Sequence, residues 1–120
     1  MSKILIVDVD PATLNTFTEL LHSHSSEIDI MTAGNVREVP NIISGSKINM
    51  VIVDLKMPDN DDLQFLAFMN RDYPNIPVIV MTAFGTAEIE RKIKALGSCQ
   101  YYEKPVDMNA LTEKIFEDLG

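Results

Sequence analysis

Short apolar runs alternate along the chain with stretches in which apolar residues recur every three or four positions. Runs of about four to eight residues that are rich in isoleucine and valine and bounded by polar residues predict β-strands. The runs in the middle of the chain are apolar at consecutive positions, which is typical of strands covered by helices on both faces. The predicted strands span residues 4–7, 28–31, 50–53, 77–81 and 100–102.

The stretches between these runs have the apolar spacing of amphipathic helices. We expect one helix to end at Gly97, a natural stop, and Asp107 to cap the start of the last helix. Strands that alternate with helices imply right-handed crossovers onto a parallel sheet, so the pattern predicts a three-layer α/β sandwich in one domain, residues 1–120. The apolar positions that define the helices are Leu14, Phe17 and Leu21; Leu66 and Met69; Ile89, Ile93 and Leu96; and Leu111 and Ile115.

The second helix has the weakest pattern. Val36, Val39 and Ile43 keep the helical period, but Pro40 lies among them and would remove a backbone hydrogen bond from a helix interior. We therefore expect a short or kinked helix that effectively starts near Pro40 and ends at Gly45.

Composition and charge narrow the class of protein. The net charge of −8 argues against direct nucleic acid binding, which needs clustered lysine and arginine. The one cysteine rules out an internal disulfide and suits a reducing compartment. No run is long enough to cross a membrane and the N-terminus lacks the layout of a signal peptide, so we expect a cytoplasmic domain that does not bind membranes.

The candidate chemistry lies where the predicted strands end. In open parallel sheets, ligands bind beyond the carboxyl ends of the strands. The first strand ends at Asp8, with Asp10 close behind; the third ends at Asp54, the fourth at Thr82, and the fifth leads into Lys104. A group of acids with one cation repels itself and favours a hard divalent ion, most simply Mg²⁺. Such a site can hold a phosphoryl group, whose transfer needs its charge neutralised by metal and lysine.

Each of these residues also has a plain structural interpretation. An aspartate after a strand is often a turn residue or a helix cap, and Asp10 before Pro11 fits the capping role as well as it fits a site. Thr82 alone would be a turn hydroxyl and Lys104 alone a solvated charge. The functional interpretation is favoured because four strand ends each supply a fitting group on the same side.

Four motifs in this order, KILIVD, VIVDLKMP, PVIVMTA and YYEKP, resemble the receiver domain of two-component response regulators. The resemblance covers essentially the whole chain. It implies a flavodoxin-like fold with five helices and a five-stranded parallel sheet in the order 2-1-3-4-5. It also implies a regulatory phosphoacceptor that takes a phosphoryl group from a sensor histidine kinase or a phosphotransfer protein, with Mg²⁺ required. Any enzymatic activity would be limited to its own phosphorylation and dephosphorylation.

The same resemblance implies roles for particular residues. The phosphorylated aspartate of the family falls on Asp54, its hydroxyl residue on Thr82, its lysine on Lys104 and its switch aromatic on Tyr101. The metal ligands would be Asp8, Asp54 and the backbone carbonyl of Lys56. Lys56 and Phe84 occupy the two positions that flank the phosphoryl group in receivers and influence how fast it hydrolyses.

The sequence departs from the family at two positions. Receivers carry two adjacent acids after the first strand, and here the second is Val9, at the position that usually touches the metal. Asp10 could take over that role through a water molecule. In the loop after the third strand, Asp62 replaces the usual glycine, which predicts an aspartate at positive φ if the backbone is kept.

Two rival functions stay open. Phosphatases similar to haloacid dehalogenases begin with a strand and an Asp-x-Asp motif, which Asp8 and Asp10 match, but their threonine would fall on Ala12 and Asp54 would have no role. A receiver-like interaction module that has lost metal-dependent phosphorylation is favoured by Val9 and disfavoured by the intact Asp54, Thr82 and Lys104. The chain ends just after its last predicted helix, and the sequence leaves open a stand-alone regulator, a homodimer, or a domain attached to a downstream effector.

Overall fold

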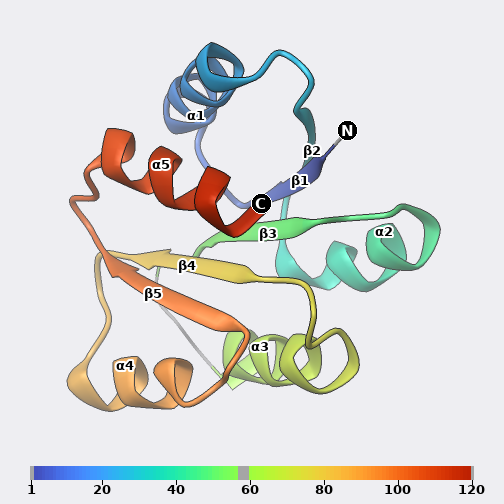
Figure 1. The fold of residues 1–120 in the computed structure, drawn as a ribbon. Coiled ribbons are helices and arrows are strands. Elements are labelled where there is room, and N and C mark those ends of the chain that lie inside the picture. Colours follow the sequence, from blue (N-terminus) through green and yellow to red (C-terminus); the bar gives the residue numbers. More distant parts are fainter. Residues whose placement is uncertain (1, 57–59, 120) are drawn as a thin grey trace.

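A parallel five-stranded sheet forms the middle layer of the protein (Figure 1). The structure, a computed structural model, describes residues 2–56 and 60–119. Within these ranges the strands follow the spatial order β2-β1-β3-β4-β5, and every neighbouring pair is parallel. The predicted sheet order is therefore confirmed. The strands are β1 (Lys3–Val7), β2 (Asp29–Ala33), β3 (Met50–Asp54), β4 (Val78–Thr82) and β5 (Cys99–Glu103).

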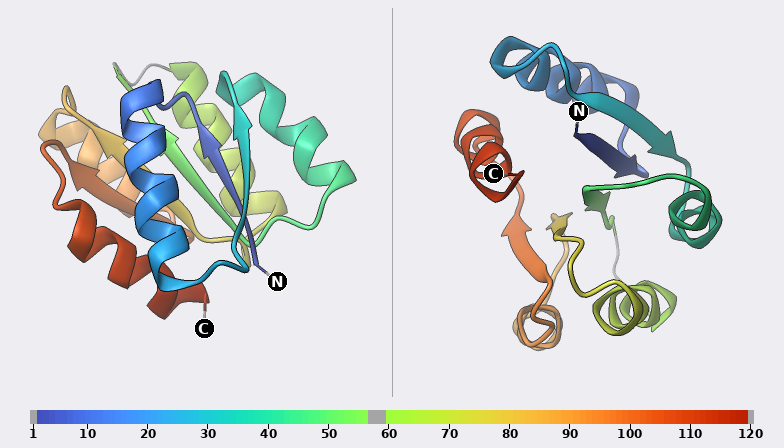
Figure 2. Two further views of the ribbon diagram at one scale, coloured as in Figure 1. Left: turned by 90° about the horizontal axis from the view of Figure 1, so that it is seen from above. Right: turned by 45° about the vertical axis from the view of Figure 1, so that its right-hand side comes forward.

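Helices cover both faces of this sheet. Helices α1 and α5 lie on one face and α2, α3 and α4 on the other, so the three-layer prediction is confirmed (Figures 1 and 2). Every residue of β3 and β4 is buried, as expected for strands covered on both sides. The helices are α1 (Pro11–His24), α2 (Val39–Gly45), α3 (Asn60–Asp72), α4 (Ala87–Lys94) and α5 (Met108–Leu119), and a 3₁₀ turn, η1 (Val36–Glu38), precedes α2.

Alternate side chains of the strands build two separate hydrophobic cores, because successive residues of a strand point to opposite faces. On the α1 and α5 side, Ile52 of β3 packs with Phe17 of α1 and Ile115 of α5. On the opposite side, Val53 packs with residues of α2, α3 and α4, including Ile93. The sheet is therefore packed on both faces, and this packing fixes the positions of the side chains at the carboxyl ends of the strands.

The local structure around Pro40 follows from where proline is tolerated. Asn35 caps the 3₁₀ turn, accepting a hydrogen bond from the Arg37 N–H at 2.9 Å, and Glu38 completes a capping box. Pro40 then occupies the first turn of α2, where no N–H donor is needed. The short helix predicted from near Pro40 to Gly45 is confirmed, with the earlier turn kept separate from it.

Two details of the expected backbone are wrong and one is right. Helix α4 ends at Lys94 with Ala95 as its C-cap, so it stops before Gly97. Asp62 lies in the first turn of α3, and among the described residues other than glycine only Asp8 has a positive φ, of 57°. Asp107 does cap α5, since its Oδ1 accepts hydrogen bonds from the N–H groups of the second and third residues of that helix.

No helix in the described part of the chain is long and apolar enough to cross a membrane.

Candidate functional site

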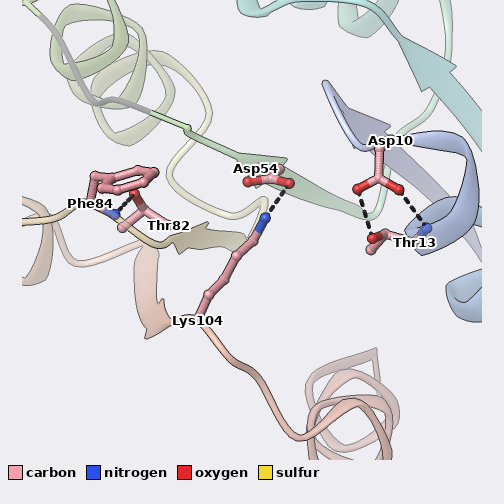
Figure 3. Close-up of polar contacts among 6 residues, drawn as sticks. All are labelled: Asp10, Thr13, Asp54, Thr82, Phe84 and Lys104. Atoms are coloured by element: carbon pink, nitrogen blue, oxygen red, sulfur yellow. Dashed lines mark hydrogen bonds and ion pairs between the residues drawn. The ribbon is translucent and has the colours of Figure 1, made fainter.

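The carboxyl edge of the sheet brings three of the predicted site residues together. Asp54 ends β3, Thr82 ends the neighbouring β4, and Lys104 directly follows β5 (Figure 3). Strand order reverses beside β1, which lies between β2 and β3, and such a switch point is where open α/β sheets bind ligands. The backbone N–H of Lys104 donates to the Thr82 carbonyl at 2.9 Å, which fixes the start of the lysine side chain beside β4.

A short ion pair at this edge joins Lys104 to Asp54. Lys104 Nζ donates to Asp54 Oδ2 at 2.6 Å, and the Asp54 side chain is only 1% exposed. Asp54 Oδ1 is buried and has no hydrogen-bond partner among the described residues. Because a buried carboxylate oxygen without a partner is unfavourable, Oδ1 is a place where a cation or a donor would bind with a gain in free energy.

Thr82 holds its hydroxyl toward its own loop. Its Oγ1 accepts a hydrogen bond from the Phe84 N–H at 3.2 Å, and the residue is fully buried (Figure 3). A hydroxyl that accepts one hydrogen bond still carries a hydrogen that it can donate. The aromatic ring of Phe84 is 70% exposed and is the one large exposed hydrophobic side chain in the described part of the chain.

Tyr101 lies on β5 with its ring half-buried against the core that contains α2, α3 and α4. Its hydroxyl oxygen is buried and makes no hydrogen bond within the described residues. Burial raises the pKa of the Tyr101 hydroxyl, and the nearby Glu103 and Glu90 carboxylates add to the increase while Lys94 opposes it. Among the described residues, packing alone therefore holds the ring inward.

Asp10 caps the first helix. Its Oδ1 accepts from the Thr13 N–H at 2.9 Å and its Oδ2 from the Thr13 hydroxyl at 2.8 Å, so both oxygens are engaged by Thr13 (Figure 3). The hydrogen bond from the Thr13 backbone lowers the pKa of Asp10, because it favours the ionised carboxylate. Of the two roles that the sequence left open for Asp10, the capping role is confirmed.

Asp8 lies at the beginning of the loop that follows β1. Its backbone N–H donates to the Ala33 carbonyl at 2.9 Å, and its φ of 57° puts it in the left-handed region, which aspartate tolerates better than most residues. Its exposed side chain lines a cavity of about 380 Å³ together with Lys56. The other residues around this cavity are Asn35, Val36, Arg37, Leu55, Asp61 and Asp62.

Val9 is half-buried and packs against the hydrophobic core on the α1 and α5 side. The described residues contain no group of three or more acidic, histidine or cysteine side chains that could hold a metal ion. The expected convergence of Asp8, Asp10 and Asp54 is therefore incomplete, because Asp10 serves the helix. Mg²⁺ is often held by one or two carboxylates with water. The unpartnered Oδ1 of Asp54 and the carboxylate of Asp8 fit that smaller set of ligands.

Sequence reasoning missed three contacts around this site. Arg37 and Asn35 line the cavity beside Asp8, and they follow the carboxyl end of β2, a strand end to which the sequence assigned no group. The Phe84 N–H restrains the Thr82 hydroxyl. Gly85 lies close to Tyr101, and nothing in the local sequence indicates this neighbour. Met57 and Pro58, which end the VIVDLKMP motif, lie outside the described residues.

Comparison with known proteins identifies the family. The sequence profile of the response regulator receiver domain matches residues 4–116, so the chain belongs to this family. Transcriptional regulatory protein GlrR of Escherichia coli is 31% identical over 118 residues, which is 98% of this chain and 26% of that protein. Sporulation initiation phosphotransferase F of Bacillus subtilis is 27% identical over 113 residues, covering 94% of this chain and 90% of that protein.

The fold agrees with this assignment. A CheY-like receiver domain from Methanospirillum hungatei superimposes with a TM-score of 0.82 at 28% identity, covering 99% of this chain and 94% of that one. The chain spans about a quarter of GlrR and nearly all of sporulation initiation phosphotransferase F. The phosphatase alternative loses its second acid, because Asp10 is held by Thr13 as a helix cap.

The valine at position 9 gives a direct test of the expected metal site. We expect Val9→Asp to increase the affinity for Mg²⁺ by roughly tenfold to a hundredfold, since one more carboxylate ligand is worth on the order of 1–3 kcal/mol. The same change should lower the melting temperature of the metal-free protein, because it removes apolar packing and adds a negative charge beside Asp8. Calorimetric Mg²⁺ titration and thermal melts measure both effects.

Val9→Asn is the matched control, since it has nearly the same shape as Val9→Asp but no charge. It should lose the packing of Val9 and gain little affinity. Equal Mg²⁺ affinities in the native protein and in Val9→Asp would mean that residue 9 does not lie at the metal site.

Proposed function

We propose that this receiver domain is a phosphoacceptor whose Asp54 takes a phosphoryl group from a sensor histidine kinase or a phosphotransfer protein. One observation carries the proposal: a buried carboxylate at the carboxyl end of the central strand, paired with Lys104 through one oxygen and unpartnered at the other. The name of the Bacillus subtilis relative, a phosphotransferase, supports a role in phosphoryl transfer for this chain. We expect the domain to act in the cytoplasm.

In the proposed transfer, the Asp54 carboxylate attacks the phosphorus atom of a phosphohistidine in line with the bond to nitrogen. An acyl phosphate bond forms, the phosphorus–nitrogen bond breaks, and the imidazole leaves with the electron pair. Lys104 Nζ, which is 2.6 Å from Asp54 Oδ2, needs only a small shift to pair with the phosphoryl oxygens. The Thr82 hydroxyl, on the adjacent strand end, can donate its hydrogen to the same group.

Receiver domains typically bind Mg²⁺, and we propose that this chain binds it too. Asp8, Asp54 and the backbone carbonyl of Lys56 would hold the ion, and water would take the position that Asp10, as a helix cap, does not fill. When bound, Mg²⁺ would neutralise negative charge on the phosphoryl oxygens. Because Val9 leaves one ligand position to water, we propose a weaker Mg²⁺ site than a receiver with two adjacent acids would have.

Phosphorylation would act as a switch through Thr82 and Tyr101. Donation by Thr82 to a phosphoryl oxygen would compete with its contact to the Phe84 N–H and draw the loop of residues 83–86 toward Asp54. Tyr101 would then change position and alter the surface formed by α4, β5 and α5. This is a local charge event that biases an element with two positions. The reader of that surface would be a downstream effector domain or a second copy of the chain.

A receiver-like module that no longer binds metal is the second candidate. The packing of Val9 into the core and the incomplete acidic cluster in the described residues favour it. The Asp54–Lys104 pair argues for the phosphoacceptor, because a domain without phosphorylation has no need for a buried carboxylate with one oxygen unpartnered.

The mass of the protein after treatment with acetyl phosphate and Mg²⁺ separates these candidates. We expect one phosphoryl adduct on the native chain and none on Asp54→Asn, because the amide cannot form the acyl phosphate. Asp10→Asn is the matched control and should still be labelled, since Asp10 serves as a helix cap. Equal labelling of native protein and Asp54→Asn would refute the assignment. No adduct on any variant, at any Mg²⁺ concentration, would favour the interaction module.

The lifetime of the acyl phosphate tests the roles proposed for Lys56 and Phe84. Both side chains are exposed next to the strand ends that carry Asp54 and Thr82, where they would obstruct the water that hydrolyses the phosphoryl group. We expect the combined change Phe84→Ala and Lys56→Asn to speed loss of the phosphoryl group by roughly tenfold or more, since access and alignment of the attacking water control this step.

Lys47→Asn is the control for the loss of one positive charge. Lys47 is exposed and precedes the amino end of β3, whereas Asp54 lies at the carboxyl end of that strand. It should leave the decay rate unchanged. If the Phe84→Ala, Lys56→Asn protein decays at the native rate, these two residues do not control hydrolysis.

A further inference from the structure

Gly85 lies where the loop after Thr82 meets the ring of Tyr101. A Cβ atom on Gly85 would overlap the Tyr101 hydroxyl oxygen and lie 3.1 Å from Tyr101 Cζ and 3.2 Å from Thr82 Cγ2. We propose that Gly85 is a positioning residue: it leaves open the space in which the Tyr101 hydroxyl rests, and so sets the resting position of this ring. The steric contact stands by itself, and its role in signalling rests on the proposed function.

The backbone of Gly85 does not explain why glycine is present. Its φ lies outside the positive range that side chains rarely adopt, so alanine would meet no backbone strain there. The space around it does explain the glycine, because two of the three nearest atoms belong to Tyr101 and the third to Thr82. A side chain at position 85 would thus meet both residues through which we propose that phosphorylation acts.

The resting position of Tyr101 is easily changed. Its ring gains free energy by packing against the core, but its buried hydroxyl has no partner within the described residues, which costs part of that gain. The free-energy preference for the inward position is therefore smaller than the packing of the ring alone would give. A single methyl group at position 85 should therefore be enough to reverse the preference.

The same contact gives a route from the phosphorylation site to the surface. Thr82 ends β4, Gly85 follows three positions later in the loop, and Thr86 caps α4 by accepting from the Ile89 N–H at 3.2 Å. A shift of this loop toward Asp54 moves Gly85 relative to the Tyr101 hydroxyl. The movement of the loop then changes the space available to the Tyr101 ring, and the ring responds to this steric change rather than to a hydrogen bond.

The test uses the unphosphorylated full chain and four variants: Gly85→Ala, Tyr101→Phe, the two combined, and Gly45→Ala. Gly45 is the matched control, because a Cβ there would meet nothing within 4 Å. NMR of labelled tyrosine rings reports the position of Tyr101 through its broadening by a soluble paramagnetic probe, and Tyr101→Phe assigns its signal among the three tyrosines. Thermal melts report stability.

We expect Gly85→Ala to increase the paramagnetic broadening of the Tyr101 ring severalfold and to lower the melting temperature by roughly 5 °C. In the Tyr101→Phe background the same substitution should lower the melting temperature by less than half as much, since the overlapping oxygen is gone. Gly45→Ala should leave the Tyr101 signal unchanged. Native-like Tyr101 signals in Gly85→Ala, or an equal loss of stability in both backgrounds, would overturn the proposal.

A second measurement separates this inference from the proposed function. The steric effect of Gly85→Ala should appear without any phosphodonor, and so it does not depend on phosphorylation of Asp54. With beryllofluoride as a phosphate analogue, the Tyr101 signal of the native protein should shift, and that of Gly85→Ala should shift by a smaller amount because the ring already lies outward. A shift as large in Gly85→Ala as in the native protein would overturn the role of Gly85 in the switch.

Discussion

The ion pair between Asp54 and Lys104 is the interaction on which the functional edge of this protein depends. Asp54 is almost fully buried, and a buried carboxylate is tolerated only when a counter-charge or hydrogen bonds compensate its loss of water. Lys104 is 50 positions later in the chain and reaches Asp54 only because β4 and β5 are laid in order beside β3. The sheet order 2-1-3-4-5 is thus what allows the ion pair of this buried carboxylate to form.

The same edge holds the two buried side-chain atoms that lack partners in the described residues, Asp54 Oδ1 and Tyr101 Oη. Elsewhere in the described chain, buried side-chain polar atoms are satisfied, as is usual in folded proteins. A protein selected for stability alone would not leave these two oxygens unpaired. One oxygen belongs to the candidate phosphoacceptor and the other to the candidate switch residue, which indicates that stability is given up where binding of a phosphoryl group and movement of a ring would recover it.

Much of this arrangement follows from local sequence, and the rest depends on contacts across the sheet. The strands, the layer order and the group formed by Asp54, Thr82 and Lys104 are predictable because consecutive apolar residues and polar strand ends carry the signal themselves. The role of Asp10 is decided by its hydrogen bond from Thr13. The aspartate-proline pair in the sequence only suggests this helix cap. The helical position of Asp62 and the closeness of Gly85 to Tyr101 depend on the path of loops, which composition does not determine.

A double-mutant cycle on the free energy of unfolding tests the dependence on the Asp54–Lys104 pair most directly. Lys104→Met keeps the aliphatic part of the lysine and leaves Asp54 buried without its counter-charge, so it should be clearly destabilising. In the Asp54→Asn background the same change should cost little, which gives a coupling energy on the order of 1–3 kcal/mol. Equal costs of Lys104→Met in both backgrounds would show that the pair does not hold the buried carboxylate, and would contradict the account.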